Sequence, residues 1–283
     1  MREVLSGDTL RLQKTTGKDQ FDALVHLAYI STPRLGNPNR TEEPFAFEAR
    51  EQIREKLIGR KCDYTIQYVA NGKRFVSVSF EEKDLATLLV EQSLAKANEK
   101  RPQTTPGGLH EKLLEIQEVE AKKTKGVWST DSKYLAKHVR EVTFFGEADY
   151  KPSTLLAQAL QEPRPLAAIL EHVFSPSFVS LYVRTLKTVI KLQIVHLFLP
   201  QETEQAIRDQ GKQFVEKMLL HRSVGVKLAR VDDNGTLVGR IHFSAGDIAS
   251  EVLKRGLCKL STPKDSDFDA NYYRELKQAQ LIG

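Results

Sequence analysis

Cysteine and tryptophan are scarce in this sequence, whose 283 residues include two cysteines, Cys62 and Cys258, and one tryptophan. Two cysteines that lie in different halves of the chain cannot build the disulfide framework of a small secreted domain. We therefore expect reduced thiols and a cytoplasmic protein, with the nucleus as a second compartment.

Long apolar runs are also missing. No run reaches the roughly 18–20 residues that a membrane-spanning helix requires. Met1, Arg2 and Glu3 lead into a strand-like pattern without the apolar core of a signal peptide. The sequence therefore predicts neither a membrane partner nor a secretory leader.

A strong excess of one charge is absent as well. The 42 Lys and Arg residues stand against 37 Asp and Glu residues, for a net charge of +5 and a pI near 9.0. This mild excess permits a polyanionic partner without requiring one, because binding depends on the local clustering of charge. The length of the chain favours two domains of about 100–200 residues each.

Short strands and helices alternate in the first half of the sequence. Alternating apolar and polar residues bounded by Gly, Asn and Pro predict strands at residues 3–13, 22–31, 62–68, 75–80 and 94–97. Apolar residues at helical spacing predict helices at residues 44–58, 84–92 and 109–125. Asp84 is expected to cap the second helix. This order fits a small barrel of the oligonucleotide-binding (OB) type, flanked by helices.

The same plan recurs about 165 residues later, which indicates tandem domains rather than a solenoid. Asn71-Gly72, for example, is echoed by Asn234-Gly235. We predict a first domain at residues 1–130, a linker at 131–165 and a second domain at 166–283. The second copy stops inside what would be its last helix, so we expect the chain to be part of a longer protein.

Several motifs resemble those of staphylococcal-nuclease-like domains, in the same order along the chain. They are Ser6-Gly7-Asp8-Thr9, Ser31-Thr32-Pro33, Asn71-Gly72-Lys73-Arg74 and Gly126-Val127-Trp128-Ser129. The tandem arrangement is similar to the first two such domains of the Tudor-SN family. This resemblance implies an α+β protein with two tandem staphylococcal-nuclease-like OB-fold β-barrels. It also implies an RNA-related role in RNA silencing (RISC) and transcriptional coactivation.

The resemblance further implies which residues would form a nuclease site. Family members that hydrolyse phosphodiesters use calcium, carboxylate ligands, a general-base glutamate and two arginines. Asp8 and Arg74 match the first aspartate and the hairpin arginine, as relics of the catalytic site. His26 and Ser31 replace an arginine and an aspartate, and Arg34 stands where the base is needed. We therefore expect no cofactor, and calcium only if Asp8 binds it.

The second copy departs further from the catalytic pattern. Ser177 is expected at the first aspartate, Gln193 at the second-strand arginine, Phe198 at the turn aspartate and Gln201 at the base. In this alignment Arg240 alone is retained, at the position of the hairpin arginine. Both copies therefore favour a binding scaffold over hydrolysis.

Basic residues on loops and strand ends are the candidates for RNA binding. They are Arg34, Arg40, Lys73, Arg74, Lys96, Lys100, Arg101 and Arg240. Three functions remain open at this point. The chain is a module for structured or double-stranded RNA that works with other domains and with silencing or transcription proteins, a calcium-dependent ribonuclease, or a protein-interaction scaffold without an RNA role.

Two further patterns predict structural roles. The histidines show no metal-ligand spacing with Cys62 or Cys258, so no zinc site is expected. Trp128 and Tyr64 are expected to lie in the core rather than to stack on bases.

Overall fold

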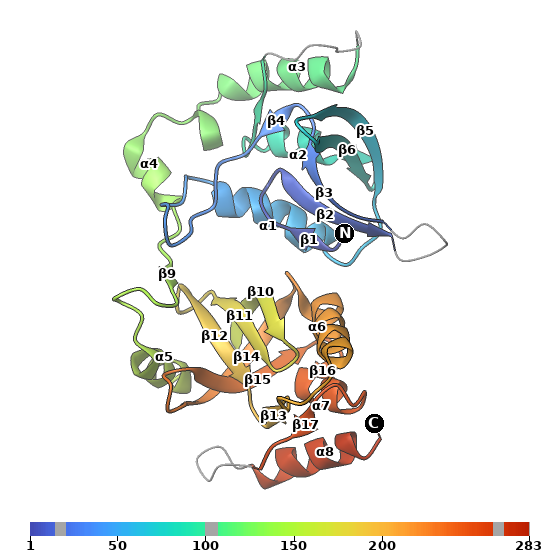
Figure 1. Cartoon of the computed structure of the whole chain (residues 1–283). Coiled ribbons are helices and arrows are strands. Elements are labelled where there is room, and N and C mark those ends of the chain that lie inside the picture. The colour runs from blue at the N-terminus through green and yellow to red at the C-terminus, as the bar shows by residue number, and fades with distance from the viewer. Residues whose placement is uncertain (15–20, 100–106, 263–268, 283) are drawn as a thin grey trace. The chain divides into compact units, whose positions relative to one another are not determined.

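A computed structural model describes residues 1–14, 21–99, 107–262 and 269–282 of the chain. The chain divides into two compact units, Met1–Glu141 (unit 1) and Val142–Gly283 (unit 2). The division falls inside the segment 131–165 that was predicted as a linker. Figure 1 shows a helix of this segment in each unit.

Unit 1 is a twisted sheet covered by helices. Its strands are β1 (Glu3–Val4), β2 (Thr9–Lys14), β3 (Phe21–Leu27), β4 (Ile30–Ser31), β5 (Asp63–Ala70), β6 (Lys73–Phe80), β7 (Lys83–Asp84) and β8 (Lys96–Ala97). Its helices are α1 (Ala46–Leu57), α2 (Leu85–Glu91), α3 (Leu109–Ala121), the 3-10 turn η1 (Gly126–Trp128) and α4 (Ser132–Lys137). The main sheet has the order β1-β2-β3-β6-β5, in which β3 and β6 run parallel.

Unit 2 repeats this plan. Its strands are β9 (Thr143–Phe144), β10 (Leu166–Ser175), β11 (Phe178–Val183), β12 (Thr188–Ile194), β13 (Leu197–Phe198), β14 (Ser223–Val231), β15 (Leu237–Phe243), β16 (Gly246–Asp247) and β17 (Lys259–Leu260). Its helices are α5 (Pro152–Leu160), α6 (Gln205–Leu219), α7 (Ile248–Leu253) and α8 (Ala270–Gln280).

The predicted α+β fold with OB-type barrels is confirmed, with one difference between the units. In unit 2, β10 pairs with both β11 and β14, and β12 pairs with β15, so five strands close into a ring. In unit 1, β5 pairs only with β6 among the strands that the structure describes, so the ring is open between β1 and β5.

Matching hydrogen bonds establish which residues of the two units are equivalent. The amide of Leu27 donates to the carbonyl of Asp8, and that of Ile194 donates to the carbonyl of Ser177, both at 2.8 Å. The expected equivalence of Asp8 with Ser177 is therefore confirmed.

In each unit the turn that carries Asp8 or Ser177 packs against a helix, α1 in unit 1 and α6 in unit 2, and the two units differ in which side of this contact carries the glycine. A Cβ atom on Gly7 would lie 2.8 Å from the Cβ of Ala49, so glycine is required there. In unit 2, Pro176 occupies the place of Gly7, and Gly211 of α6 occupies the place of Ala49. A Cβ atom on Gly211 would lie 2.8 Å from Cγ of Pro176. Each unit thus keeps one small residue at this contact, on opposite sides.

Candidate nucleic-acid interface

Asp8 lies in the turn between β1 and β2, at the mouth of the unit 1 barrel. Its Oδ1 accepts hydrogen bonds from the hydroxyls of Ser6 at 2.7 Å and Thr9 at 3.0 Å. Its Oδ2 accepts the backbone N–H of Thr32 at 3.1 Å. The carboxylate therefore joins two turns of the barrel and already has a donor on each oxygen.

These contacts do not fit a calcium site. Calcium takes six to eight oxygen ligands, usually from several carboxylates. Among the residues that the structure describes, no three Asp, Glu, His or Cys side chains are grouped to hold a metal ion. The residues around Asp8 thus favour a structural role for this carboxylate.

Asp8→Asn tests this role. An amide nitrogen cannot accept a hydrogen bond, so the variant loses at least one contact, and we expect unit 1 to lose about 1 kcal/mol of stability. A ligand that binds the folded protein stabilises it by mass action. Because we expect no calcium binding at Asp8, millimolar calcium should shift the melting temperature of the unchanged protein by less than about 1 °C. A larger calcium-dependent shift that Asp8→Asn abolishes would show that Asp8 is a metal ligand.

His26 and Lys73 lie together on the outer face of the sheet, beside Asp8. His26 pairs with Thr9 and with Phe75 across neighbouring strands, and its Nδ1 lies 3.2 Å from the Thr9 hydroxyl. Burial lowers the pKa of His26, and the positive charge of Lys73 lowers it further, against the opposite effect of Asp8. His26 is therefore neutral at pH 7, and Lys73 supplies the positive charge at this place.

The alternation of β6 separates Lys73 from Arg74. Side chains of successive strand residues point to opposite faces. Arg74 is opposite Val25 and shares the face of Val76, both of which are buried in the core, whereas Lys73 shares the face of Phe75. In this register Lys73, rather than the predicted Arg74, shares the face of His26. Arg74 is exposed at the end of the strand.

The other predicted cations of unit 1 have different surroundings. Arg34 is exposed, and its backbone N–H donates to Glu43 at 2.8 Å. Arg40 donates from its guanidinium to the carbonyl of Leu35 at 2.9 Å. Lys100 and Arg101 lie outside the described residues. Arg34 thus presents its charge to solvent two residues after Thr32, whose amide binds Asp8.

A hollow of about 340 Å³ lies next to this turn. Ser31, Thr32 and Pro33 form one side, and Lys96 lies at its edge. The Lys96 ammonium is 4.7 Å from the centre of the Trp128 ring. Trp128 is half-buried, as expected for a packing residue, and it fixes Lys96 beside the turn.

The corresponding mouth of unit 2 is a larger cleft, of about 560 Å³. Ser177 and Gln193 occupy the places of Asp8 and His26, as predicted. The Gln193 amide donates to the carbonyl of Leu197 at 3.1 Å. Phe198 is exposed at its rim. The described lining contains one carboxylate, Asp232, whose Oδ1 accepts two backbone amides of its own turn.

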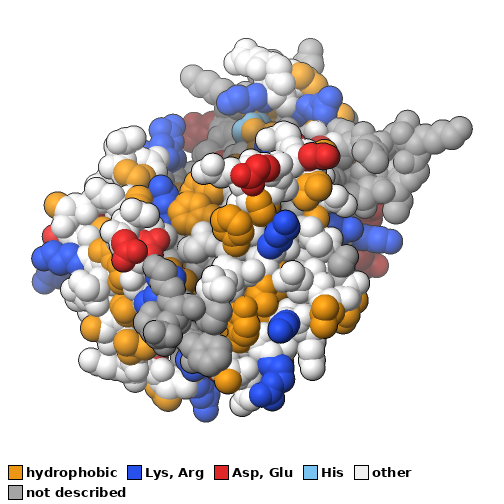
Figure 2. All heavy atoms as spheres, turned by 60° about the horizontal axis from the view of Figure 1, so that its bottom comes forward, with side chains coloured by type: hydrophobic (Ala, Val, Ile, Leu, Met, Phe, Trp, Pro, Cys, Tyr) orange, Lys and Arg blue, Asp and Glu red, His pale blue; other side chains and the backbone are white. Residues whose placement is uncertain are grey.

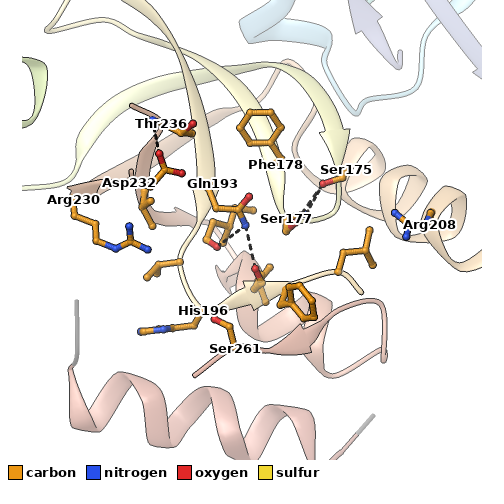
Figure 3. A pocket seen from close by; sticks show the side chains of 16 residues that line it. Ser175, Ser177, Phe178, Gln193, His196, Arg208, Arg230, Asp232, Thr236 and Ser261 are labelled. Carbon is orange, nitrogen blue, oxygen red and sulfur yellow. Dashed lines mark hydrogen bonds between the residues drawn. The ribbon is translucent and has the colours of Figure 1, made fainter. Parts of the chain in front are cut away.

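Two arginines that sequence reasoning missed line this cleft from opposite sides, Arg208 and Arg230 (Figure 3). Arg208 donates to the carbonyls of Pro200, Gln201 and Thr203 at 2.6–2.9 Å, so it holds the loop where a catalytic base was expected. Neither arginine belongs to a motif of the repeat, so no sequence pattern pointed to them.

Arg240 does not occupy the place predicted for it. The pairing of Leu192 with Leu237 matches that of Val25 with Arg74, so Leu237 is the equivalent of Arg74. Arg240 lies three residues further along β15, with its guanidinium 3.7 Å from the centre of the Tyr272 ring and 3.2 Å from Asp269. It therefore fastens α8 to the barrel.

Cations do not form one continuous patch on the face drawn in Figure 2. There, Lys and Arg side chains are scattered among apolar and acidic ones.

The class of the protein follows from sequence comparison together with this fold. A family described as "Staphylococcal nuclease homologue" matches residues 24–130, which lie in unit 1. Unit 1 is thus a staphylococcal nuclease-like domain, with the barrel and mouth that the motifs predicted.

The relatives that match most of the chain are longer proteins. Staphylococcal nuclease domain-containing protein 1 of Drosophila melanogaster is 27% identical over 282 residues, which cover 92% of this chain and 29% of the relative. Ribonuclease TUDOR 2 of Arabidopsis thaliana is 23% identical over 346 residues, which cover 99% of this chain and 35% of the relative. The protein from Schizosaccharomyces pombe with the same name as the fly relative is 24% identical over 269 residues, or 90% of this chain and 29% of the relative.

These matches confirm the resemblance to the Tudor-SN family. The chain spans about a third of the length of these relatives. Homology therefore supports a nucleic-acid-related role at the level of the family. None of the helices in the described part of the chain combines the length and the apolar composition of a membrane-spanning segment.

Proposed function

We propose that this chain is a pair of RNA-binding domains in which the nuclease site of the family has become a phosphate-binding site. The observation that carries the proposal is the chemistry at the mouth of unit 1. Both carboxylate oxygens of Asp8 accept hydrogen bonds from within unit 1. Lys73 lies beside His26, and Arg34 follows the turn whose Thr32 amide binds Asp8. A cation at this place attracts a phosphate and cannot take a proton from water.

The wider role proposed for the chain rests on its relatives. As part of a longer protein, the domain pair binds structured or double-stranded RNA in RNA silencing and transcriptional coactivation. Its partners are the other domains of that protein and silencing or transcription proteins, in the cytoplasm and the nucleus. Small barrels of this type commonly bind nucleic acids through charge and aromatic stacking.

Lys73→Glu and Arg34→Glu test the site. We expect each to weaken binding to a double-stranded RNA roughly fivefold to tenfold at moderate salt, and to reduce the slope of log affinity against log salt by about one. Arg74→Glu is the matched control, because it makes the same change of charge one residue away on the other face of β6. Fluorescence anisotropy over a salt series measures all three variants.

Each outcome distinguishes the three functions. Equal losses in Lys73→Glu and Arg74→Glu would contradict the assigned face. Unchanged RNA binding in all variants would favour a protein scaffold, for which the scattered charge in Figure 2 is an argument. Calcium-dependent cleavage of the RNA that disappears in Asp8→Asn would favour the ribonuclease, and would overturn the proposal.

A further inference from the structure

Exposed aromatic side chains are few in the described part of the chain. Four Phe and Tyr side chains there are at least 40% exposed: Tyr64, Phe145, Phe174 and Phe198. Tyr64 lies on the edge strand β5 and is therefore not the core residue that the sequence predicted. Phe198 lies at the rim of the unit 2 cleft. Phe145 and Phe174 differ from these two because both rings lie beside the same ammonium group, that of Lys191 in β12.

A β-bulge in β10 brings Phe174 to the outer face of the unit 2 sheet. The pairing of β10 with β11 shifts between Val173 and Ser175, so Phe174 is an extra residue in the strand. A bulge of this kind re-aims a side chain. The centre of the Phe174 ring lies 5.1 Å from that of Phe178 and 4.7 Å from that of His172. Three rings therefore lie side by side on this face.

A positive charge lies among these rings. The ammonium of Lys191 is 4.1 Å from the centre of the Phe145 ring and 5.5 Å from that of Phe174, so cation–π contacts fix its position. Among the described residues, no carboxylate forms an ion pair with it. We call this surface the aromatic face, and its members are Phe145, His172, Phe174, Phe178 and Lys191.

Unit 1 shows that the fold leaves this part of the barrel uncovered. Strand pairing makes Leu5 the equivalent of Phe174 and Leu24 the equivalent of Lys191. These two leucines are 39% and 43% exposed. The described helices that follow the barrel of unit 1 therefore do not lie over this position, and the face is open in both units.

Charge distinguishes the aromatic face from its equivalent in unit 1. There, Arg11 forms ion pairs with Glu3 at 3.1 Å and with Asp22 at 3.2 Å. In unit 2, strand pairing places His172 at the position of Glu3 and Val189 at the position of Asp22. Neither residue is a carboxylate. The unit 1 face thus neutralises its own charge, whereas the aromatic face keeps a cation for an anion from outside.

We propose that the aromatic face of unit 2 binds unpaired bases of a single-stranded RNA. Unpaired bases stack on aromatic side chains, and a cation beside the rings binds the phosphate that joins them. The bases of a duplex are already stacked on each other and cannot make this contact. An apolar protein segment would cover the rings but would leave Lys191 without an anion.

The aromatic face also leads to the mouth of the unit 2 barrel. Phe178 belongs to the face and lines the cleft of about 560 Å³ as well (Figure 3). A strand stacked on the face can therefore continue into this cleft. The class of ligand rests on the proposed function, but the site uses no residue from the mouth of unit 1.

Phe174→Leu tests the stacking. The probe is a fluorescein-labelled single-stranded oligoadenylate of about ten nucleotides, a length that one small barrel can bind. We expect the variant to bind it about fivefold to tenfold more weakly, because leucine keeps an apolar contact but has no flat ring. Phe174→Tyr should keep the affinity within about twofold, since the ring is retained. Leu5→Ala, at the equivalent position of unit 1, is the matched control and should leave binding unchanged.

Two further measurements separate stacking from charge. Lys191→Gln should reduce the slope of log affinity against log salt by about 0.7 for this single strand, because one phosphate contact is lost. Phe174→Leu should leave that slope unchanged. It should also leave binding of a blunt-ended double-stranded RNA unchanged, because no unpaired base is present. Fluorescence anisotropy measures all of these affinities, and circular dichroism checks that each variant is folded.

The outcomes distinguish this proposal from the one for unit 1. No binding of the oligoadenylate, equal binding to Phe174→Leu, or equal losses in Phe174→Leu and Phe174→Tyr would overturn the aromatic face. A dimer in analytical ultracentrifugation that Phe174→Leu dissociates would assign the face to a second copy instead. Unchanged duplex binding in Lys73→Glu, with weakened single-strand binding in Phe174→Leu, would contradict the mouth of unit 1 and support the aromatic face.

Discussion

Arg54→Ala should destabilise unit 1 by about 3–5 kcal/mol. The Arg54 side chain is 1% exposed in the middle of α1. Its Nε and Nη2 donate to the two carboxylate oxygens of Glu51 at 2.6 and 2.7 Å. Removing the guanidinium leaves a carboxylate in the interior without its bidentate partner, which is far more costly than losing an exposed ion pair. Urea unfolding followed by Trp128 fluorescence measures the loss in unit 1.

Two further variants separate charge from packing. Lys56→Ala, on an exposed position of the same helix, should change stability by less than about 0.5 kcal/mol. Replacing the pair with apolar residues, as in Glu51→Leu with Arg54→Met, should recover most of the loss because no buried charge is left. If the free energy of unfolding of Arg54→Ala lies within about 1 kcal/mol of that of the unchanged protein, water replaces the guanidinium without a large cost in free energy.

Gly126→Ala should release η1 from the barrel and cost about 2–4 kcal/mol. Gly126 has a φ of +55°, and a Cβ atom would lie 2.1 Å from the carbonyl oxygen of Ser93. This oxygen also accepts the amide of Val127 at 2.9 Å, a bond that the displaced turn would lose. Since Trp128 is the single tryptophan of the chain, its emission should shift to the red as it becomes exposed.

Gly72→Ala is the control for backbone conformation alone. Gly72 has a φ of +71°, but no atom lies within 4 Å of an added Cβ. The substitution should therefore cost only the left-handed backbone penalty, about 1–2 kcal/mol, without a shift in Trp128 emission. Equal effects of the two substitutions would show that the contact with Ser93 contributes nothing.

The sequence predicted the elements well where local chemistry determines them. The turn at Asn71-Gly72, with both residues at positive φ, joins β5 and β6 as expected. Asp84 caps α2 by accepting the amide of Thr87 at 3.0 Å. The repeat of the two units could also be predicted from the sequence, because each unit carries its own turns and helix caps at similar spacing.

Strand register could not be predicted from the motifs. A shift of one residue moves a side chain to the other face, so the choice between Lys73 and Arg74 depends on the pairing of β6 with β3. The Gly-Arg motif aligned Arg240 with Arg74, but the pairing of the strands aligns Leu237 with Arg74. Likewise, the exposure of Tyr64 depends on which strand covers β5, a long-range property that its own sequence does not contain.

The contact between the first turn and its helix has a consequence for building hybrid proteins. Moving α1 into unit 2 would bring Ala49 against Pro176, whereas moving α6 into unit 1 would set Gly211 against Gly7 and leave a void. The two copies have therefore diverged beyond free exchange of parts. A chimaera would have to carry each helix together with its own first turn, and recombination between the two halves of the coding sequence would break this match unless both parts moved together.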